Sequence, residues 1–329
     1  MARPPAAPPY RVGFLLVPEF PMMAFAAAIE PLRSANRLVD ETRFSWQLFS
    51  RDGASVRASN AIEIAVHRAV GDDCPLDLLL ICAGTRDAGA GDEASIRWLR
   101  ALARRGVALG GVSLGAYALA HAGLLDGRRC AMHWESLDAF AHRFPRIKPT
   151  TDIFVIDGNR YTCAGGTAAM DMMLQVIADR NGRDLANSVS EQFIHSRIRD
   201  TRDPQRMNIQ SRLGVANDKL IAAVAMMEDA SEDPRPVQQI AADVDLSPRQ
   251  LERLFAKYLR TTPAKYYLDL RLARARLLLL DTTHPILDVA VACGFASASH
   301  FSRCYRALYG RRPSDERTGK PSVTSPRRA

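Results

Sequence analysis

The sequence predicts an α/β domain followed by an all-α domain. From Arg11 to about Gly182, short apolar runs alternate with stretches of helical periodicity, which is typical of a mostly parallel sheet with helices on both faces. After Asp218 the apolar residues follow helical spacing alone. A chain of 329 residues with 47% hydrophobic residues is long enough to bury a core in each domain.

Each element of the first domain is predicted from one run of this pattern. Strands are expected over residues 12–17, 46–50, 76–82 and 107–112, and helices over residues 22–38, 94–105, 115–125 and 166–180. Pro31 is expected to bend the first helix or to end a first piece of it. Gly158 and Asn159 separate residues 152–157 from residues 160–163, which predicts a β-hairpin.

The domain boundaries follow from polar stretches. Residues 185–199 are predicted to form the last helix of the first domain, and the polar stretch around Pro204 is predicted to be a linker. The expected organisation is a flexible tail over residues 1–9, the α/β domain over 10–200, the linker over 201–217, the all-α domain over 218–316 and a disordered tail over 317–329.

The positive charge of the chain is concentrated in the all-α domain. Residues 248–312 hold 12 Lys and Arg against 4 Asp and Glu, a net charge of +8 that equals the excess of the whole chain. The preceding residues 217–247 are acidic. A basic block inside a foldable segment indicates a surface that binds phosphates.

The spacing of the cysteines indicates whether a metal or cofactor is bound, and the apolar runs indicate the compartment of the protein. The six cysteines show neither C-x-x-C nor zinc-finger spacing, so most are expected to be buried, reduced thiols, and no metal or cofactor is expected. The chain has no run of 18 apolar residues and its first ten residues have no apolar signal core. These features predict a cytoplasmic protein with no membrane partner.

The all-α domain contains an internal repeat. Residues 236–263 align with residues 285–313 at ten positions when one residue is inserted before the second helix of the second copy. The matched pairs are Val237 with Ile286, Ile240 with Val289, Ala241 with Ala290, Asp245 with Gly294, Leu246 with Phe295, Leu251 with Phe301, Arg253 with Arg303, Phe255 with Tyr305, Tyr258 with Leu308 and Pro263 with Pro313.

Each copy has the chemistry of a helix-turn-helix unit. In order, it has a small alanine that lets two helices cross closely, a residue that tolerates positive φ, an apolar plug and a serine that can cap the next helix. These residues are Ala241, Asp245, Leu246 and Ser247 in the first copy and Ala290, Gly294, Phe295 and Ser297 in the second. The second helix of each copy is expected to bury one face, formed by Leu251, Leu254, Phe255 and Tyr258 or by Phe301, Cys304, Tyr305 and Leu308.

The opposite face of each second helix carries the predicted DNA contacts. These residues are Arg249, Gln250, Arg253 and Lys257 in the first copy and Ser299, His300 and Arg303 in the second. Arg and Gln side chains form paired hydrogen bonds with guanine and adenine edges in the major groove. A further set near helix ends is expected to meet phosphates, namely Arg260, Arg306, Arg311 and Arg312.

A long amphipathic helix over residues 265–280 separates the two units. Two recognition helices about 34 Å apart enter successive major grooves on one face of DNA. Residues 218–316, with strings such as SPRQLERLFAKYL and CGFASASHFSRCYRALYGRRPSDER, resemble the AraC-family DNA-binding domain. The resemblance implies a transcription regulator, usually an activator, that binds double-stranded DNA and contacts RNA polymerase. Asp245 departs mildly from the family pattern, in which Gly is common.

The first domain carries a G-x-S-x-G motif, Gly111-Val112-Ser113-Leu114-Gly115. This motif is typical of the nucleophile elbow of serine hydrolases, which places a side chain on a sharp turn above a sheet. His133 is the candidate base, and either Asp152 or Asp171 is a candidate to orient it. The alternative of a serine hydrolase or amidase with a DNA-binding tail therefore stays open from the motif alone.

A second resemblance covers residues 11–200. The strings GVSLGAYALAHAGLLDGRRCAMHWE and YTCAGGTAAMDMML are similar to the PfpI-like, class I glutamine amidotransferase-like fold, which is flavodoxin-like. In the enzymes that these strings resemble, the residue at the elbow is a cysteine. This chain has Ser113 at that position, which is a poorer nucleophile. We therefore expect a non-catalytic sensor that also forms a homodimer.

The resemblance implies a ligand, because regulators with this architecture often sense small nitrogen-containing metabolites. The expected ligand is therefore such a metabolite, for example an amino acid or a betaine. The backbone N–H groups of Leu114 and Gly115 are expected to hold a carboxylate, and Trp134 with Glu135 is expected to suit a cation. The candidate ligand-binding residues are Phe20, Glu30, Ser113, Leu114, His133 and Trp134. A ligand-independent regulator is the remaining alternative.

Overall fold

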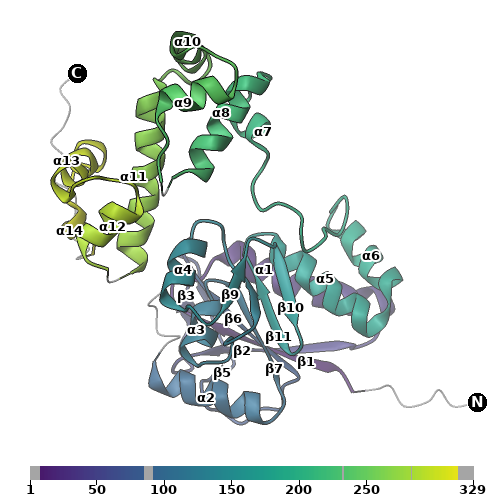
Figure 1. Cartoon of the computed structure of the whole chain (residues 1–329). Helices are drawn as coiled ribbons and strands as arrows, with labels where there is room; N and C mark the ends of the chain where they lie inside the picture. The colour runs from purple at the N-terminus through teal and green to yellow at the C-terminus, as the bar shows by residue number, and fades with distance from the viewer. Residues whose placement is uncertain (1–7, 85–91, 232, 283, 318–329) are drawn as a thin grey trace, which may run out of the picture. The chain divides into compact units, whose positions relative to one another are not determined.

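The computed structural model describes residues 8–84, 92–231, 233–282 and 284–317, and Figure 1 shows the whole chain. The chain forms two compact units, the first ending at Gln205 and the second beginning at Arg206. The predicted tails over residues 1–9 and 317–329 lie almost entirely outside the described residues.

The first unit is built on a seven-stranded sheet among the described residues. Its strands lie in the order β10 (Phe154–Asp157), β11 (Arg160–Cys163), β7 (Ala108–Ser113), β6 (Leu78–Ala83), β1 (Tyr10–Leu16), β2 (Phe44–Ser50) and β5 (Arg68–Ala69). All neighbours run parallel except the hairpin of β10 and β11. The mostly parallel sheet and the hairpin are confirmed.

Helices cover both faces of this sheet (Figure 1). Alternate residues of β1 enter different cores, with Phe14 in one and Leu15 in the other, because successive strand side chains point to opposite faces. The core around Phe14 includes residues of α1 (Met22–Val39), α5 (Ala168–Asn181) and α6 (Arg183–Gln192). The core around Leu15 includes residues of α2 (Glu93–Arg104), α3 (Ala116–His121) and α4 (Leu137–Arg143).

Several local predictions for the first unit are wrong. The alternative that Pro31 ends a first helical piece is wrong, because α1 continues through this buried residue, and α3 ends at His121 and not at residue 125. The helix expected over residues 185–199 stops at Gln192, where Ile194 has a φ of 54° and the N–H groups of Ile194 and His195 turn back to the carbonyls of Glu191 and Ser190. Short elements that lack a clear apolar pattern were not predicted, namely β3 (Val56–Arg57), β4 (Glu63–Ile64), β8 (Arg129–Ala131), β9 (Lys148–Thr150), β5 and α4.

The second unit consists of helices among its described residues. They are α7 (Ile209–Leu213), α8 (Asp218–Asp229), α9 (Val237–Asp243), α10 (Pro248–Leu259), α11 (Pro263–Asp281), α12 (Ile286–Ala292), α13 (Ala298–Tyr309) and α14 (Pro313–Arg317). Helix α7 lies inside the stretch expected to be a linker, where Asn208 caps it and Gly214 ends it. None of the described helices is long and apolar enough to cross a membrane.

All six cysteines lie among the described residues and carry free thiols. Five are buried and Cys304 is partly exposed, as the absence of metal-site spacing predicted for most of them.

Candidate DNA-binding surface and ligand site

The two helix-turn-helix units have the same turn. Asp245 has a φ of 52° and Gly294 a φ of 70°, so both turns pass through the left-handed region. Ala241 and Ala290 are fully buried. The positive-φ turn predicted from the repeat is confirmed in both copies, and the alanine before it is buried in both.

A serine caps each second helix. The Ser247 hydroxyl accepts a hydrogen bond from the Gln250 backbone N–H, and the Gln250 side-chain oxygen accepts one from the Ser247 N–H. This reciprocal pair is a capping box. In the second copy the Ser297 hydroxyl accepts from the His300 N–H. The Gln250 amide oxygen is therefore bound within the helix end.

The buried face of each second helix is narrower than expected. Leu251 and Phe255 are fully buried in α10, as are Phe301 and Tyr305 in α13. The prediction is wrong for the last pair, because Tyr258 is 37% exposed and Leu308 is 40% exposed. These two residues lie in the last helical turn, where the helix leaves the core. The same departure occurs at the same repeat position in both copies.

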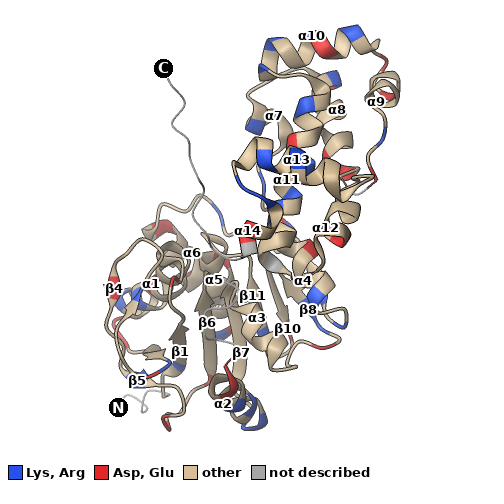
Figure 2. Cartoon of the chain, turned by 90° about the vertical axis from the view of Figure 1, so that its left-hand side faces the viewer, with Lys and Arg blue, Asp and Glu red and all other residues tan. Residues whose placement is uncertain are grey.

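The predicted DNA-contacting side chains all lie on exposed positions of α10 and α13. They are Arg249, Gln250, Arg253, Lys257, Ser299, His300 and Arg303. Figure 2 shows Lys and Arg in blue along α10. Arg303 also lines a cavity of about 710 Å³ together with Arg306 and Arg312. Three guanidinium groups around one hollow provide positive charge next to α13.

Part of the basic block is used inside the fold. The Arg271 guanidinium donates to the carbonyl oxygens of Cys293 and Gly294, and Arg274 donates to that of Ala292. These carbonyls lie at the end of α12, where a positive charge is favourable. Arg276 pairs with the buried Glu316 at 2.8 Å. The net charge of residues 248–312 therefore overstates the charge that is free to meet phosphates.

The G-x-S-x-G motif of the first unit forms a sharp elbow. Ser113 ends β7 with a φ of 57°, in the left-handed region that non-glycine residues rarely occupy. The glycines on either side are required by space. A Cβ on Gly111 would lie 2.3 Å from the Ala116 nitrogen, and one on Gly115 would lie 1.9 Å from the Ile81 carbonyl oxygen.

The expected carboxylate site at the elbow is wrong in one respect. The Leu114 N–H donates to the Ala83 carbonyl at 3.0 Å, and the Gly115 N–H donates to the Val112 carbonyl at 3.1 Å. Both N–H groups are thus used within the turn and do not offer an anion site. Ser113 itself remains partly exposed.

The surroundings of Ser113 come from the ends of neighbouring strands. The buried Cys163 thiol, at the end of β11, accepts hydrogen bonds from the backbone N–H groups of Gly165 and Ser113, and burial raises its pKa to about 11. A Cβ on Gly165 would lie 2.8 Å from the Ser113 Cβ. Because ligands of open α/β sheets bind outside the carboxyl ends of the strands, this edge is the candidate ligand site.

Sequence reasoning missed Glu19 at the same edge. Glu19 follows β1, is exposed and has a φ of 64°. A Cβ on Gly84 would lie 2.2 Å from the Glu19 carbonyl oxygen, and Gly84 follows Ala83, which pairs with Ser113. Its place three residues after the end of β1 is the sequence signal that could have found it.

The His133 loop follows β8, which is tied to the same part of the sheet because the Ala131 N–H donates to the Thr162 hydroxyl beside Cys163. The Glu135 N–H donates to His133 Nδ1, and the His133 ring lies against Trp134 with centroids 5.5 Å apart. Trp134 is 37% exposed and Glu135 is exposed, and the Glu135 carboxylate lies 3.8 Å from His133 Nδ1.

The acids proposed to orient His133 are engaged elsewhere. Asp152 accepts hydrogen bonds from Arg129 and Thr150, and Asp171 binds Arg199 and His195. None of these contacts is with His133, so they give no support to either acid as its orienting partner.

Two other candidate ligand residues lie in unsuitable surroundings. Phe20 is fully buried, with its ring 5.6 Å from that of Phe25, so it belongs to the core of the first unit. Glu30 is half-buried and binds Arg33, three residues along α1, at 2.7 Å. The burial of Phe20 argues against its predicted role in ligand binding. Glu30 forms an ordinary ion pair with Arg33 on the surface of the helix.

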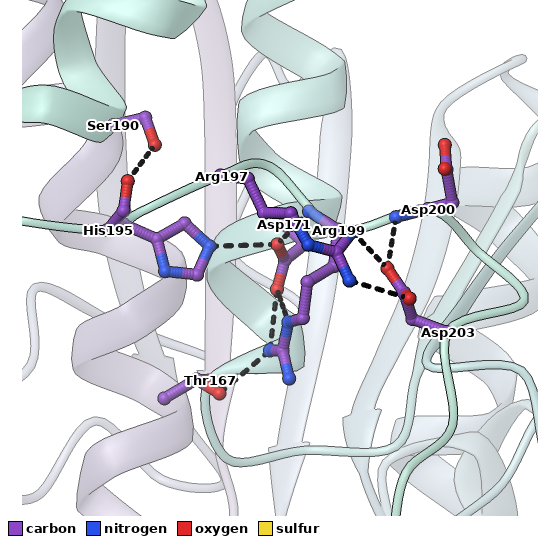
Figure 3. Close-up of polar contacts among 8 residues, drawn as sticks. All are labelled: Thr167, Asp171, Ser190, His195, Arg197, Arg199, Asp200 and Asp203. Atoms are coloured by element: carbon purple, nitrogen blue, oxygen red, sulfur yellow. Dashed lines mark hydrogen bonds and ion pairs between the residues drawn. The ribbon is translucent and has the colours of Figure 1, made fainter.

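The sequence reasoning also did not find the Asp171 cluster, which is Asp171 with Thr167, His195 and Arg199 (Figure 3). Asp171 is fully buried on α5. Its carboxylate accepts from the backbone N–H of Arg199 at 2.8 Å and from Nε and Nη2 of the same residue at 3.0 and 2.7 Å. His195 Nε2 lies 3.0 Å from the other side of the carboxylate, and Arg199 also donates to Thr167.

Comparison with known proteins agrees with both units. A DJ-1/PfpI family model matches residues 11–179, and a helix-turn-helix domain model matches residues 240–319. The HTH-type transcriptional regulator GbdR of Pseudomonas aeruginosa is 44% identical over 95% of this chain and 85% of its own length. The HTH-type transcriptional regulator CdhR of the same organism is 45% identical over 94% of this chain and 91% of its own length.

A solved structure matches the first part of the chain. The crystal structure of an AraC family transcriptional regulator from Pseudomonas putida is 33% identical, with a TM-score of 0.52, and covers 56% of this chain and 100% of its own.

Proposed function

The chain belongs to the AraC family of DNA-binding transcription regulators that carry a PfpI-like domain, and from this premise we propose that it reads operator DNA with α10 and α13 under the control of a small zwitterion. The zwitterion, an amino acid or a betaine, binds at the carboxyl edge of the first sheet. The first unit performs no chemistry on it.

The observation that carries the DNA-reading proposal is the agreement of the two copies. Arg253 and Arg303 occupy the same repeat position, and both are exposed on a helix whose opposite face is buried. Arg at such a position donates two hydrogen bonds to guanine in the major groove. Selection of bound sequences from a random double-stranded DNA pool tests the proposal. Enrichment of two half-sites is expected, and the absence of any enriched sequence would contradict specific reading.

The ligand proposal rests on the groups at the carboxyl edge. Trp134 offers an exposed ring for a quaternary or primary ammonium, and Glu135 and Glu19 offer carboxylates beside the same edge. A thermal-shift screen of the full chain against amino acids, betaines, carnitine and polyamines tests it. A ligand at 100 times its dissociation constant stabilises the folded state by about 2.7 kcal/mol, which a shift in melting temperature reports. If none of these compounds stabilises the chain, the protein is better described as a ligand-independent regulator.

The non-catalytic assignment rests on the chemistry of the elbow. Ser113 replaces the more nucleophilic cysteine of the resemblance, and His133 Nδ1 accepts a hydrogen bond from the Glu135 N–H in its own loop. Asp152 and Asp171 are bound to other residues. These contacts support the elbow as a structural turn at the sheet edge, and none of them joins Ser113 to His133 or to either acid.

A second candidate function is a serine hydrolase or amidase. The observation in its favour is the left-handed backbone of Ser113, since strained conformations gather at active sites. A reactive-serine probe applied to the chain and to Ser113→Ala separates the two functions. Labelling that disappears in the variant favours the enzyme, and equal labelling of both proteins favours the sensor.

The partners follow from the proposed function. We expect a homodimer that grips two half-sites and contacts RNA polymerase in the cytoplasm. Sedimentation of the purified chain with and without operator DNA measures the subunit number, and a strictly monomeric complex would contradict the dimer.

A further inference from the structure

Residues 193–205 are the stretch of chain between α6 and the second unit, and we call them the strap. They contain neither helix nor strand, so no ladder of backbone hydrogen bonds fixes them. They leave α6 at Phe193 and reach the second unit at Arg206. What holds them is a set of specific contacts with the first unit.

The amino-terminal half of the strap is anchored by Asp171 (Figure 3). Three hydrogen bonds from Arg199 and one contact with the His195 ring meet a carboxylate that is fully buried. The Ser190 hydroxyl also donates to the His195 carbonyl. A buried carboxylate requires partners of this kind, because an unpaired buried charge is strongly unfavourable. The anchor therefore combines the side chains of Arg199 and His195 with the backbone N–H of Arg199.

The carboxyl-terminal half is anchored by Gln205 and Thr201. The Gln205 amide donates to the carbonyls of Met132 and Asp152 and accepts from the Trp134 N–H at 2.8 Å. The Ile153 N–H donates to the Thr201 carbonyl at 2.9 Å. Between the anchors, Arg197 and Asp203 form two hydrogen bonds that fold the strap on itself.

Both anchors lie on residues that border the proposed ligand edge. Arg199 donates to Thr167, two residues after Gly165, and Gly165 lies against Ser113. Gln205 binds the backbone of Trp134, whose ring is the proposed cation site. A ligand that moves either the Gly165 turn or the Trp134 loop changes the fit of an anchor directly.

One residue of the strap is held against its local preference. Ile194 has a φ of 54° and its side chain is 94% exposed. A β-branched residue in the left-handed region is a conformational outlier. Because its apolar side chain is exposed, no burial energy offsets this strain. The backbone N–H groups of Ile194 and His195 donate to the carbonyls of Glu191 and Ser190 and close this turn locally, and the His195 contact with Asp171 adds a side-chain restraint beside it. Loss of the anchor removes that restraint from the strap.

We propose that the Asp171 cluster and Gln205 form a releasable latch, through which the state of the ligand edge sets the length of free chain between the two units. This inference rests on the proposed function and adds its mode of regulation. Released, the strap spans at most about 45 Å when fully extended. As a flexible chain it has a root-mean-square length of about 20 Å. Such a change in tether length alters the effective concentration of one DNA-binding unit at a second half-site.

The latch is tested with the purified full-length chain and no effector. The variants are Asp171→Asn, which removes the anchoring charge, and Gln205→Ala, which releases the other end without leaving a buried charge. The control is Asp77→Asn, because Asp77 also binds one arginine, Arg11, through both side-chain and backbone N–H groups, but lies outside the strap.

Two readouts are needed. The first is the rate of trypsin cleavage after Arg197, Arg199 and Arg202, which reports opening of the strap. The second is binding to DNA that carries two selected half-sites at spacings varied in steps of half a helical turn, about 5 base pairs.

In wild type we expect slow cleavage and a dependence of affinity on spacing of about tenfold or more, because a short tether reaches few geometries. In Asp171→Asn and Gln205→Ala we expect cleavage to rise about tenfold and the spacing dependence to fall to about threefold or less. Asp77→Asn is expected to match wild type in both readouts.

Three results would overturn the latch. They are wild-type cleavage in both strap variants, faster cleavage with an unchanged spacing profile, and a wild type that binds all spacings equally. Should Asp171→Asn fail to fold, Gln205→Ala decides the question alone. None of these readouts uses an effector, so the latch can fail while a compound still stabilises the chain, and the thermal-shift screen can fail while the latch holds.

Discussion

Asp245 and Gly294 occupy the same turn position of the two helix-turn-helix units, and both have a left-handed backbone, with φ values of 52° and 70°. Glycine adopts this conformation without a steric penalty, whereas Asp bears part of that penalty. The first helix-turn-helix copy therefore carries backbone strain that the second copy does not.

Replacing Asp245 with glycine is expected to stabilise the all-α unit that begins at Arg206 by about 0.5–1 kcal/mol. The reason is that the backbone strain relieved in the folded state exceeds the conformational freedom added to the unfolded chain. Urea unfolding of the full chain, followed by helical circular dichroism, measures the change. The converse change, Gly294→Ala, is expected to destabilise by at least a similar amount. Equal stabilities of both variants and wild type would mean that the turn conformation carries no cost.

Arg253→Ala and Arg303→Ala are each expected to weaken binding to the selected operator by about 1–3 kcal/mol and to relax specificity at one base position. The reason is that each exposed guanidinium lies on the face opposite the buried residues of its helix. Fluorescence anisotropy on operator and random DNA measures both effects. Arg97→Ala, an exposed pair with Glu93 on α2, is the matched control and should bind as wild type.

An equal loss of affinity on operator and random DNA would instead assign Arg253 or Arg303 to phosphate contacts. The salt dependence of binding separates the two cases, since a lost phosphate contact lowers the slope by about one.

The sequence predicted best what depends on neighbouring residues. The turn at Gly294, the serine caps and the burial of Phe255 follow from spacing within about 20 residues, and the structure agrees. The Asp171 cluster could not be predicted this way, because Asp171 and Arg199 are 28 residues apart and only the fold brings them together. The apolar spacing favoured a helix as far as Arg199, whereas α6 ends at Gln192 in a local turn with a positive φ at Ile194.

The ligand edge shows the same division. Spacing located the elbow at Ser113, but it did not reveal that the Leu114 N–H is bound to Ala83 of the adjacent strand. Nor did it reveal that Phe20 is buried against Phe25. Sequence spacing therefore located the elbow, and strand pairing decides which of its backbone groups are already bound.

Asp77 is expected to make stability depend on acid pH. Hydrogen bonds from Arg11 hold the pKa of the Asp77 carboxyl below its ordinary value. A carboxyl with a lowered folded pKa stabilises the protein above its unfolded pKa, about 3.9, and this contribution is lost as the pH falls through the folded pKa. Both side chains are partly exposed, so the contribution is expected to be at most about 1 kcal/mol.

Urea unfolding of wild type and Asp77→Asn at pH 6, 4 and 3 measures this contribution. The difference between the two proteins should be largest at pH 6 and shrink below about pH 4. A difference that stays constant over this range would assign the effect of the substitution to lost packing or lost neutral hydrogen bonds.

Gly115→Ala is expected to disrupt the elbow more than a substitution that only strains a backbone angle. The added Cβ would lie 1.9 Å from the Ile81 carbonyl oxygen and 3.0 Å from the Val112 nitrogen, and both are backbone atoms inside a seven-stranded sheet. Neither can move without breaking strand pairing, so we expect a loss of about 3 kcal/mol or more.

Gly123→Ala is the matched control, because Gly123 has a φ of 70° but no atom within 4 Å of the added Cβ. Its loss is expected to be about 1–2 kcal/mol, from backbone conformation alone. Urea unfolding of both variants decides the matter: a larger loss at Gly123 would mean that the sheet yields readily at the elbow, and that the shape around Ser113 is not fixed by these glycines.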